Sequence, residues 1–148
     1  NVVDGLPKGS VGGTYSGNPV ACAAANATLD IMQADDVWQS AKHYAQTIET
    51  TIRQWQQEGI SPWLFGLTGI GAMRGIELRH PEHDVHPSVM ARVLTKARER
   101  GLLLMPSGQH RHIIRLLPPL TIEPDTLKEG LDILKEVLIA LPDGLPAA

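Results

Sequence analysis

Apolar side chains recur along the chain first at helical spacing and then at strand spacing. Residues 19–32 are small and apolar almost throughout, which predicts a helix that is close-packed on most of its faces. Residues 37–58 carry apolar side chains at helical spacing, which predicts a second helix with one buried stripe. The stripe consists of Val37, Ala41, Tyr44, Ala45, Ile48, Ile52 and Trp55.

The middle of the chain changes to a strand pattern. Residues 66–79 mix apolar side chains with Gly69, Gly71 and Gly75, which predicts one strand whose glycines allow close backbone approach. After a polar loop rich in proline and histidine, Ser88 is expected to cap a third helix that stops at Gly101.

Two short apolar runs and an amphipathic helix complete the pattern. Residues 102–105 and 113–117 suggest two strands in antiparallel pairing, and Glu123-Pro124-Asp125 begins the last helix. That helix places Leu127, Leu131, Leu134 and Leu138 along one face. This order of elements predicts an α+β fold in which helices cover a small antiparallel sheet.

Composition narrows the class of protein. The chain of 148 residues is 43% hydrophobic and 20% charged, as expected of a globular protein. A net charge of −3 gives no general attraction to nucleic acid, and no apolar run approaches the length of a membrane span. We therefore expect no nucleic-acid partner and no membrane partner.

The cysteine and tryptophan side chains are predicted to have packing roles. The single cysteine, Cys22, excludes an internal disulfide and suits a reducing compartment, so a cytoplasmic location is expected. Cys22 lies in a run of small residues and is expected to be packed there. Trp38, Trp55 and Trp63 are interpreted as packing anchors, because no basic residues are interleaved with them.

A glycine-rich turn at residues 12–19, Gly-Gly-Thr-Tyr-Ser-Gly-Asn-Pro, is the first candidate for chemistry. Asn18 is predicted to cap the helix that follows, with Pro19 at its first position. Unpaired N–H groups at the start of that helix would suit a phosphate. The alternative is a tight connection without a ligand, since the turn matches neither a Walker motif nor a dinucleotide fingerprint.

Arg115 is the second candidate, because it interrupts the apolar run Ile-Ile-Arg-Leu-Leu at residues 113–117. If the side chain is enclosed, its planar guanidinium suits a carboxylate that it binds with two hydrogen bonds. If the strand alternates, the same side chain simply points to solvent. The sequence leaves both readings open.

Three histidines and one lysine are the remaining candidates for metal binding or catalysis. His80, His83 and His86 lie three residues apart and would suit zinc or nickel in a helix, but Pro81 and Pro87 favour a loop. We therefore assign no metal ligand. Lys8 lies in an exposed-looking turn and is not taken as a Schiff-base lysine.

Together these segments resemble the C-terminal part of class III pyridoxal-phosphate aminotransferases, the family of 4-aminobutyrate and ornithine aminotransferases. Residues 12–19 resemble the family's Gly-Thr-Tyr-x-Gly-Asn-Pro segment, and residues 69–78 are similar to its Gly-x-Gly-x-Met strand. Residues 100–103 and 114–122 are similar to its closing pattern, which ends in Pro-Leu-Thr-Ile. The resemblance runs from about residue 4 to residue 140 in the family's order.

The resemblance implies a role for individual residues. Thr14, with Gly13 beside it, would contact the phosphate of pyridoxal 5'-phosphate held by the neighbouring subunit of a homodimer. Arg115 would bind the carboxylate of the amino-acid or oxo-acid substrate. The Schiff-base lysine would lie further upstream than this sequence reaches, so the chain by itself is expected to be catalytically incomplete.

The same resemblance implies a domain division and an activity. Residues 1–34 would form a phosphate-contacting loop and connecting helix on the large-domain side, and residues 35–148 the C-terminal small domain of a fold-type I transferase. The parent enzyme would move an amino group from an ω-amino acid such as 4-aminobutyrate to 2-oxoglutarate or pyruvate. Two other readings stay open: a stand-alone dimerisation or binding module without cofactor, and a metal-binding module that uses His80, His83 and His86.

Overall fold

The computed structural model describes residues 3–10, 12–33 and 35–143. The chain divides into two compact units, Asn1–Val37 and Trp38–Ala148. The first unit contains a short 3₁₀ helix, Val3–Gly5, and the helix α1, Pro19–Met32. Within the described residues, no helix combines the length and the apolar character needed to cross a membrane.

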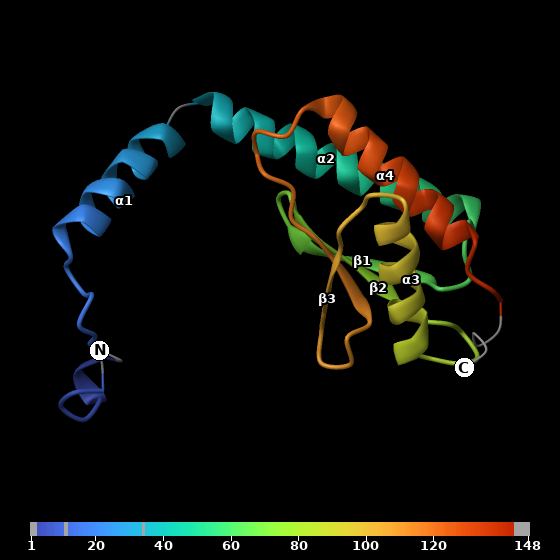
Figure 1. Ribbon diagram of the computed structural model, residues 1–148, viewed down its shortest axis with the longest axis horizontal. Helices are drawn as coiled ribbons and strands as arrows, with labels where there is room; N and C mark the ends of the chain where they lie inside the picture. Colours follow the sequence, from blue (N-terminus) through green and yellow to red (C-terminus); the bar gives the residue numbers. More distant parts are fainter. Residues whose placement is uncertain (1–2, 11, 34, 144–148) are drawn as a thin grey trace. The chain divides into compact units, whose positions relative to one another are not determined.

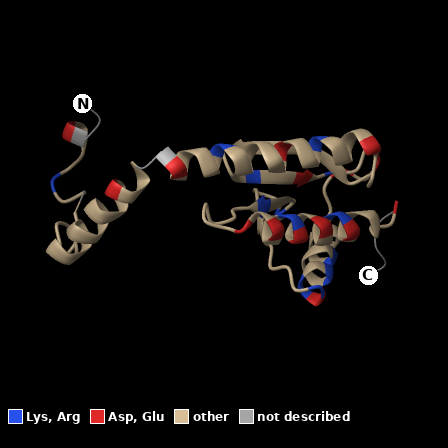
Figure 2. Ribbon diagram, turned by 90° about the horizontal axis from the view of Figure 1, so that it is seen from above, with Lys and Arg blue, Asp and Glu red and all other residues tan. Residues whose placement is uncertain are grey.

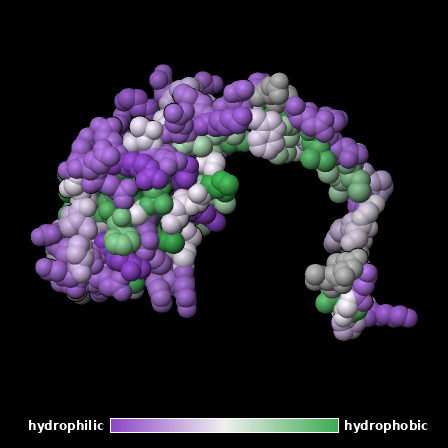
Figure 3. All heavy atoms as spheres, turned by 180° about the vertical axis from the view of Figure 1, so that it is seen from behind, coloured by the Kyte–Doolittle hydropathy of each residue, from purple (hydrophilic) through white to green (hydrophobic). Residues whose placement is uncertain are grey.

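Helix α1 exposes its apolar side chains. None of its residues is buried, and Val20 and Ile31 are 77% and 65% exposed. Figure 3 shows green, hydrophobic side chains at the surface along this helix. Within this chain the predicted close packing of α1 is therefore not observed, because the described residues of the first unit provide no second layer for the helix to pack against. Cys22, predicted to be packed, is an exposed free thiol for the same reason.

The second unit is an α+β domain, as predicted (Figure 1). Its elements in chain order are α2 (Asp35–Glu58, of which the first three residues belong to the first unit), β1 (Leu64–Ile70), β2 (Met73–Leu78), α3 (Pro87–Glu99), β3 (Met105–Ser107), β4 (Ile113–Leu116) and α4 (Pro124–Ile139). The four strands form one sheet in the order β1-β2-β4-β3, and every neighbouring pair is antiparallel.

The single strand predicted for residues 66–79 is in fact a hairpin of β1 and β2. Ile70 pairs with Met73, so that only Gly71 and Ala72 form the loop. Gly71 has φ +59°, a left-handed conformation that glycine adopts without the steric cost that other residues incur. The prediction of β3 also needs correction, since the strand begins at Met105 rather than at residue 102, although its antiparallel pairing with β4 is confirmed.

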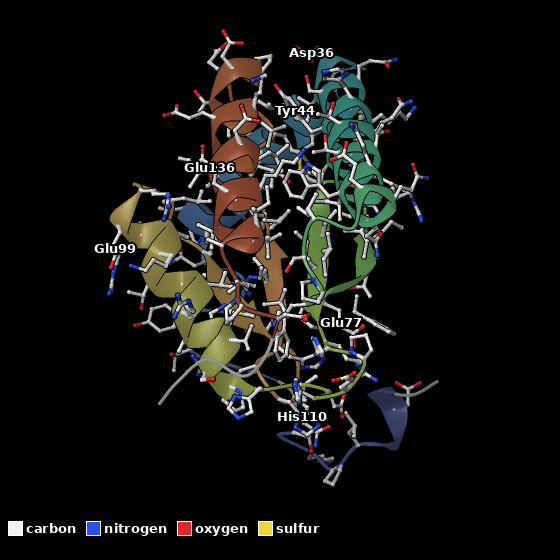
Figure 4. The ribbon with its side chains drawn as sticks, turned by 90° about the vertical axis from the view of Figure 1, so that its right-hand side faces the viewer. Asp36, Tyr44, Glu77, Glu99, His110 and Glu136 are labelled. Atoms are coloured by element: carbon white, nitrogen blue, oxygen red, sulfur yellow. The ribbon has the colours of Figure 1, made fainter. Side chains whose placement is uncertain are left out.

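Helices α2, α3 and α4 all contribute to one hydrophobic core against the sheet. The predicted stripe of α2 is confirmed by Tyr44, Ile48, Ile52 and Trp55, which are at most 7% exposed. In Figure 4, Tyr44 lies between α2 and α4, and its hydroxyl donates a hydrogen bond to the carbonyl of Ile122, just before α4. The predicted face of α4 is likewise buried. Acidic and basic residues recur along the ribbons of α2 and α4 (Figure 2).

Trp55 and Trp63 are packing anchors, whereas Trp38 is not. Trp63 is fully buried, and its indole N–H donates to the carbonyl of Pro142 at 2.8 Å. Trp38 is 48% exposed at the start of the second unit. The sequence alone did not show which of the three tryptophans is exposed, because the helical spacing of Trp38 is also compatible with a buried position.

The two faces of the sheet differ sharply in burial. On the face toward the helices, Ile76 of β2 and Ile114 of β4 pair directly and are fully buried. On the other face, Ile70, Met73 and Met105 are 80%, 49% and 58% exposed. Because successive strand residues point to opposite faces, this one-sided burial fixes the direction of every side chain in the sheet.

Helix α3 begins two residues earlier than predicted. Its N-cap is His86 rather than Ser88, and Pro87 occupies the first helical position. The Nδ1 atom of His86 accepts a hydrogen bond from the backbone N–H of Ser88 at 3.4 Å. An imidazole nitrogen thus performs the capping role that serine or aspartate oxygens usually perform.

An ion pair joins α2 to β2 on the covered side of the sheet. Arg74, whose side chain is 13% exposed, lies 2.6 Å from Glu49. Arg53, one helical turn from Glu49, donates to the same carboxylate at 2.9 Å. The hydrogen bond from Arg53 lowers the pKa of Glu49, partial burial opposes this shift, and the positive charge of Arg74 adds to it.

We expect Gly75→Ala to destabilise the fold by about 1–3 kcal/mol, because overpacking forces neighbouring atoms to move. A Cβ atom at Gly75 would lie 2.7 Å from Cγ2 of Ile113 and 2.7 Å from Oγ1 of Thr68. Gly66→Ala is the matched control on the same sheet face, since the nearest atom there is 3.7 Å away. Urea unfolding of both variants measures the difference, and equal stabilities would contradict the close packing at Gly75.

We expect the stabilisation by Glu49 to depend on pH. A carboxyl group with a lowered pKa in the folded state stabilises the protein above its unfolded pKa, and this stabilisation disappears as the pH falls through the folded pKa. Thermal melts should therefore show Glu49→Gln less stable than the parent protein at neutral pH, with the gap closing on acidification. The exposed Glu129→Gln on α4 serves as control. A gap that stays constant with pH would rule out the carboxylate charge as its cause.

Candidate functional site

The glycine-rich turn lies entirely at the surface of the first unit. Two backbone hydrogen bonds close it, from Ser16 N to the Gly13 carbonyl at 3.0 Å and from Asn18 N to the Tyr15 carbonyl at 3.1 Å. Thr14 lies inside this turn with an exposed side chain. A Cβ atom at Gly13 would meet only the Ser16 hydroxyl, at 3.8 Å, so a ligand can approach the backbone there.

Asn18 caps α1 as predicted, and this cap removes the N–H groups on which the phosphate prediction relied. Its Oδ1 atom accepts from the backbone N–H groups of Val20 at 3.0 Å and Ala21 at 3.1 Å. Pro19 has no N–H to offer. The first donors of the helix are therefore occupied, and a phosphate at this turn would depend on the Thr14 hydroxyl and the backbone beside Gly13.

This donor set fits one edge of a phosphate group. A hydroxyl and an accessible peptide N–H can donate to phosphate oxygens, and the positive end of the α1 dipole lies nearby. Asn18 keeps the turn in one conformation relative to the helix axis. Lys8 is exposed and belongs to the same unit, but nothing in the geometry of the described residues brings it into the turn.

Arg115 lies on β4, on the open face of the sheet, with an exposed side chain. Its direct neighbours across the sheet are Gly75 on β2 and Met105 on β3. The buried side chain of Ile114 faces the helices, so strand alternation directs Arg115 away from them. Of the two readings left open, the exposed position is the one observed within this chain.

Ion pairs of the described residues do not involve Arg115. Apolar side chains surround it on the same face, from Met105 beside it to Met73 near the β1–β2 turn. An exposed guanidinium amid apolar groups can bind a carboxylate with two parallel hydrogen bonds. Thr14 and Arg115 belong to different units of the chain.

A charged cluster on the same face was not found from the sequence. The Glu77 carboxylate on β2 lies 3.0 Å from Arg79 and 3.5 Å from Nε2 of His112. Arg79 also stacks over the ring of Phe65, at 5.1 Å from its centroid. Strand alternation could have placed Glu77 on the open face, but only if residues 66–79 had been recognised as a hairpin.

The histidines predicted as alternative metal ligands have other contacts. His80 is buried and stacks on His83, with ring centroids 4.7 Å apart, while Trp63 packs against His80 at 4.9 Å. The Nδ1 atom of His80 accepts from the backbone N–H of Glu82. His86, as described, caps α3. Within residues 3–10, 12–33 and 35–143, no three His, Cys, Asp or Glu side chains are placed to hold a metal ion.

Known proteins of similar sequence and structure define the class of protein to which this chain belongs. The family model "Aminotransferase class-III" matches residues 1–138. Among solved structures, an acetylornithine aminotransferase from Elizabethkingia anophelis is 27% identical with a TM-score of 0.73, over 95% of this chain and 35% of that one. An amine transaminase from an uncultivated Pseudomonas species, in its PLP-bound form, is 28% identical with a TM-score of 0.74, over 88% and 30%.

Curated relatives are enzymes of the same kind. A 2-aminoadipate transaminase of Pseudomonas putida is 52% identical over 92% of this chain and 33% of that protein. The 4-aminobutyrate aminotransferase GabT of Escherichia coli is 32% identical over 91% and 32%. The chain belongs to the class III aminotransferases, as the resemblance indicated, and it spans about a third of the length of the curated relatives it matches.

Proposed function

We propose that the protein of which this chain is part transfers an amino group between a carboxylate-bearing amino acid and an oxo acid, 2-oxoglutarate or pyruvate. The observation that carries this proposal is the exposed guanidinium of Arg115 on the open sheet face of a class III aminotransferase domain. We further propose that Arg115 binds the substrate carboxylate. Its exposed position on the open sheet face leaves the guanidinium accessible to that ligand.

Pyridoxal 5'-phosphate, when bound, supplies the electron sink for amino-group transfer. We propose that Thr14 donates its hydroxyl hydrogen bond to the cofactor phosphate and that the backbone at Gly13 approaches it closely. The exposure of the whole turn supports a contact to a group outside the first unit. The partner that fits is the neighbouring subunit of a homodimer.

Two classes of amino donor fit the same guanidinium. An ω-amino acid of the 4-aminobutyrate type carries its only carboxylate far from the amino group, and 2-aminoadipate carries a second carboxylate at its far end. The relative with 52% identity, a 2-aminoadipate transaminase, favours the second class. Relatives at 32% identity, named for 4-aminobutyrate and 5-aminovalerate, support the first.

Comparing kcat/KM for 2-aminoadipate, 4-aminobutyrate and 5-aminovalerate in the full-length enzyme tests the activity and ranks the donors. We expect Arg115→Ala to raise KM for the preferred donor at least about tenfold, because hydrogen bonds to charged groups contribute about 1.5–3 kcal/mol each. Since Arg115 is exposed, the melting temperature should change little. An unchanged KM would exclude the carboxylate-binding role.

We expect Thr14→Ala to weaken cofactor affinity about tenfold, through loss of one hydrogen bond to a charged phosphate. Mixed dimers test whether the contact crosses the interface. One subunit carries Thr14→Ala, and the other lacks the lysine to which the family attaches its cofactor. If Thr14 acts across the interface, one intact site forms and the mixed dimer regains affinity and activity. If Thr14 acts within its own subunit, both sites stay defective. Ser16→Ala, in the same turn, serves as control.

A further inference from the structure

We propose that Met105 is a positioning residue for Arg115: it lies along the aliphatic part of the arginine side chain, keeps the guanidinium directed away from the sheet and shields it from water. This role rests on the proposed binding of the substrate carboxylate by Arg115, and it adds a determinant of affinity to that site. Both residues belong to the second unit.

The sheet register brings Met105 directly beside Arg115. Met105 of β3 and Arg115 of β4 are paired residues, so their side chains share the open face of the sheet. Directly opposite residues of an antiparallel pair have Cβ atoms about 4.5–5.5 Å apart, a distance at which two long side chains pack against each other. Met105 is therefore in a position to cover one side of the arginine.

On its other side, Arg115 is paired with Gly75 of β2, which has no side chain. The space above Gly75 is already occupied, because a Cβ atom there would lie 2.7 Å from Cγ2 of Ile113 and 2.7 Å from Oγ1 of Thr68. Arg115 therefore has neighbouring side chains on both flanks, and its guanidinium extends away from the sheet, where the residue is exposed. Of the two residues paired with it, only Met105 contributes a side chain.

Pro106 keeps Met105 at this position. Strand β3 is an edge strand of three residues, and its middle residue, Pro106, pairs with Ile114. Proline has no N–H to donate, so it suits a position of an edge strand whose N–H side faces away from the sheet. A shift of β3 by one residue would turn Met105 to the covered face and bring Pro106 opposite Arg115. A residue other than Met105 thus fixes the register, so substitution of Met105 leaves the strand in place.

A methionine beside an arginine affects carboxylate binding in two ways. Arginine lays its methylene groups along apolar surface and keeps its charged end in water, so the methionine limits the orientations that the guanidinium adopts. Fewer orientations are then lost when a carboxylate binds. The apolar thioether also displaces water and salt ions from one side of the guanidinium, which strengthens its attraction to a carboxylate. Met105 is 58% exposed, so these effects concern Arg115 more than the stability of the fold.

The experiment measures the Kd of glutarate, a dicarboxylate with no amino group to transfer, by calorimetry on the full-length protein at low and at high salt. We expect Met105→Ala to weaken glutarate binding about two- to fivefold, the effect of one cross-strand neighbour, and to make the Kd more dependent on salt. Met105→Leu, which keeps an apolar side chain of similar size, should retain the parent Kd. The KM of the preferred amino donor should follow the same order, with kcat retained.

Met73→Ala is the matched control for Met105→Ala. Met73 is a methionine of the same sheet face with a similar exposure of 49%, but it pairs with Ile70 rather than with Arg115. Its removal should weaken glutarate binding less than Met105→Ala does. Equal losses in the two variants would show a general effect of apolar surface and overturn the proposed role of Met105.

Combining Met105→Ala with Arg115→Ala tests whether Met105 acts through the arginine. If it does, the loss caused by Met105→Ala disappears once the guanidinium is absent. A loss of the same size in both backgrounds would overturn the positioning role, as would an unchanged Kd in a folded Met105→Ala protein. Melting temperatures establish that each variant is folded, and Met105→Thr, whose side chain is suited to strands, repeats the comparison if Met105→Ala unfolds.

Arg115→Ala alone separates the positioning role from the proposed function. If this variant leaves glutarate binding unchanged, the carboxylate-binding role of Arg115 fails together with the positioning role of Met105. If it weakens binding while the Met105 variants do not follow the expected order, only the positioning role fails.

Discussion

Burial of one sheet face under three helices is the constraint on which the second unit depends. Ile76 and Ile114 face each other from adjacent strands and have no exposed surface. Fully burying an aliphatic side chain of this size contributes about 1.5–3 kcal/mol. A shift of β4 by one residue would expose Ile114 and place Arg115 in the core without a counter-ion, which is far more costly. The position of Arg115 is therefore set by the packing of its neighbour.

The same alternation organises the charges. Arg74, two residues before Ile76, shares its face and is drawn under α2, where Glu49 neutralises it. Glu77, one residue after Ile76, lies on the opposite face, which is also the face of Arg115. One hairpin thus divides its charged residues between a structural ion pair and a candidate binding face. The hairpin requires glycine at position 75, because the side chains of Ile113 and Thr68 occupy the space that a Cβ atom would need.

Long helical periods made much of the fold predictable from sequence. The stripes of α2 and α4 each extend over several turns, and the buried residues agree with them. The region 66–79 was harder, because Gly71 is equally compatible with a bulge within one strand and with a turn between two. The predicted packing of α1 was not observed for another reason. An apolar composition indicates that a helix is covered, but it does not indicate whether the covering layer belongs to the same chain.

At the candidate site, the sequence around single residues did not determine which way their side chains point or which groups they bind. Arg115 in an apolar run fits either face of a strand, and only the register with β2 decides between them. At the turn before α1, two predictions excluded each other. Asn18 was expected to cap the helix and the helix N–H groups to bind phosphate, yet each N–H that the cap takes is no longer available to a ligand.

The apolar surroundings of Arg115 have their largest effect when the open face is covered. In water, a guanidinium and a carboxylate attract weakly, since solvent screens both charges. Met73, Met105 and Ile70 cannot pair with either charge, so a protein layer over this face would exclude water around Arg115 without supplying a competing ion. The apolar surroundings therefore strengthen any ion pair that Arg115 forms once this face is covered.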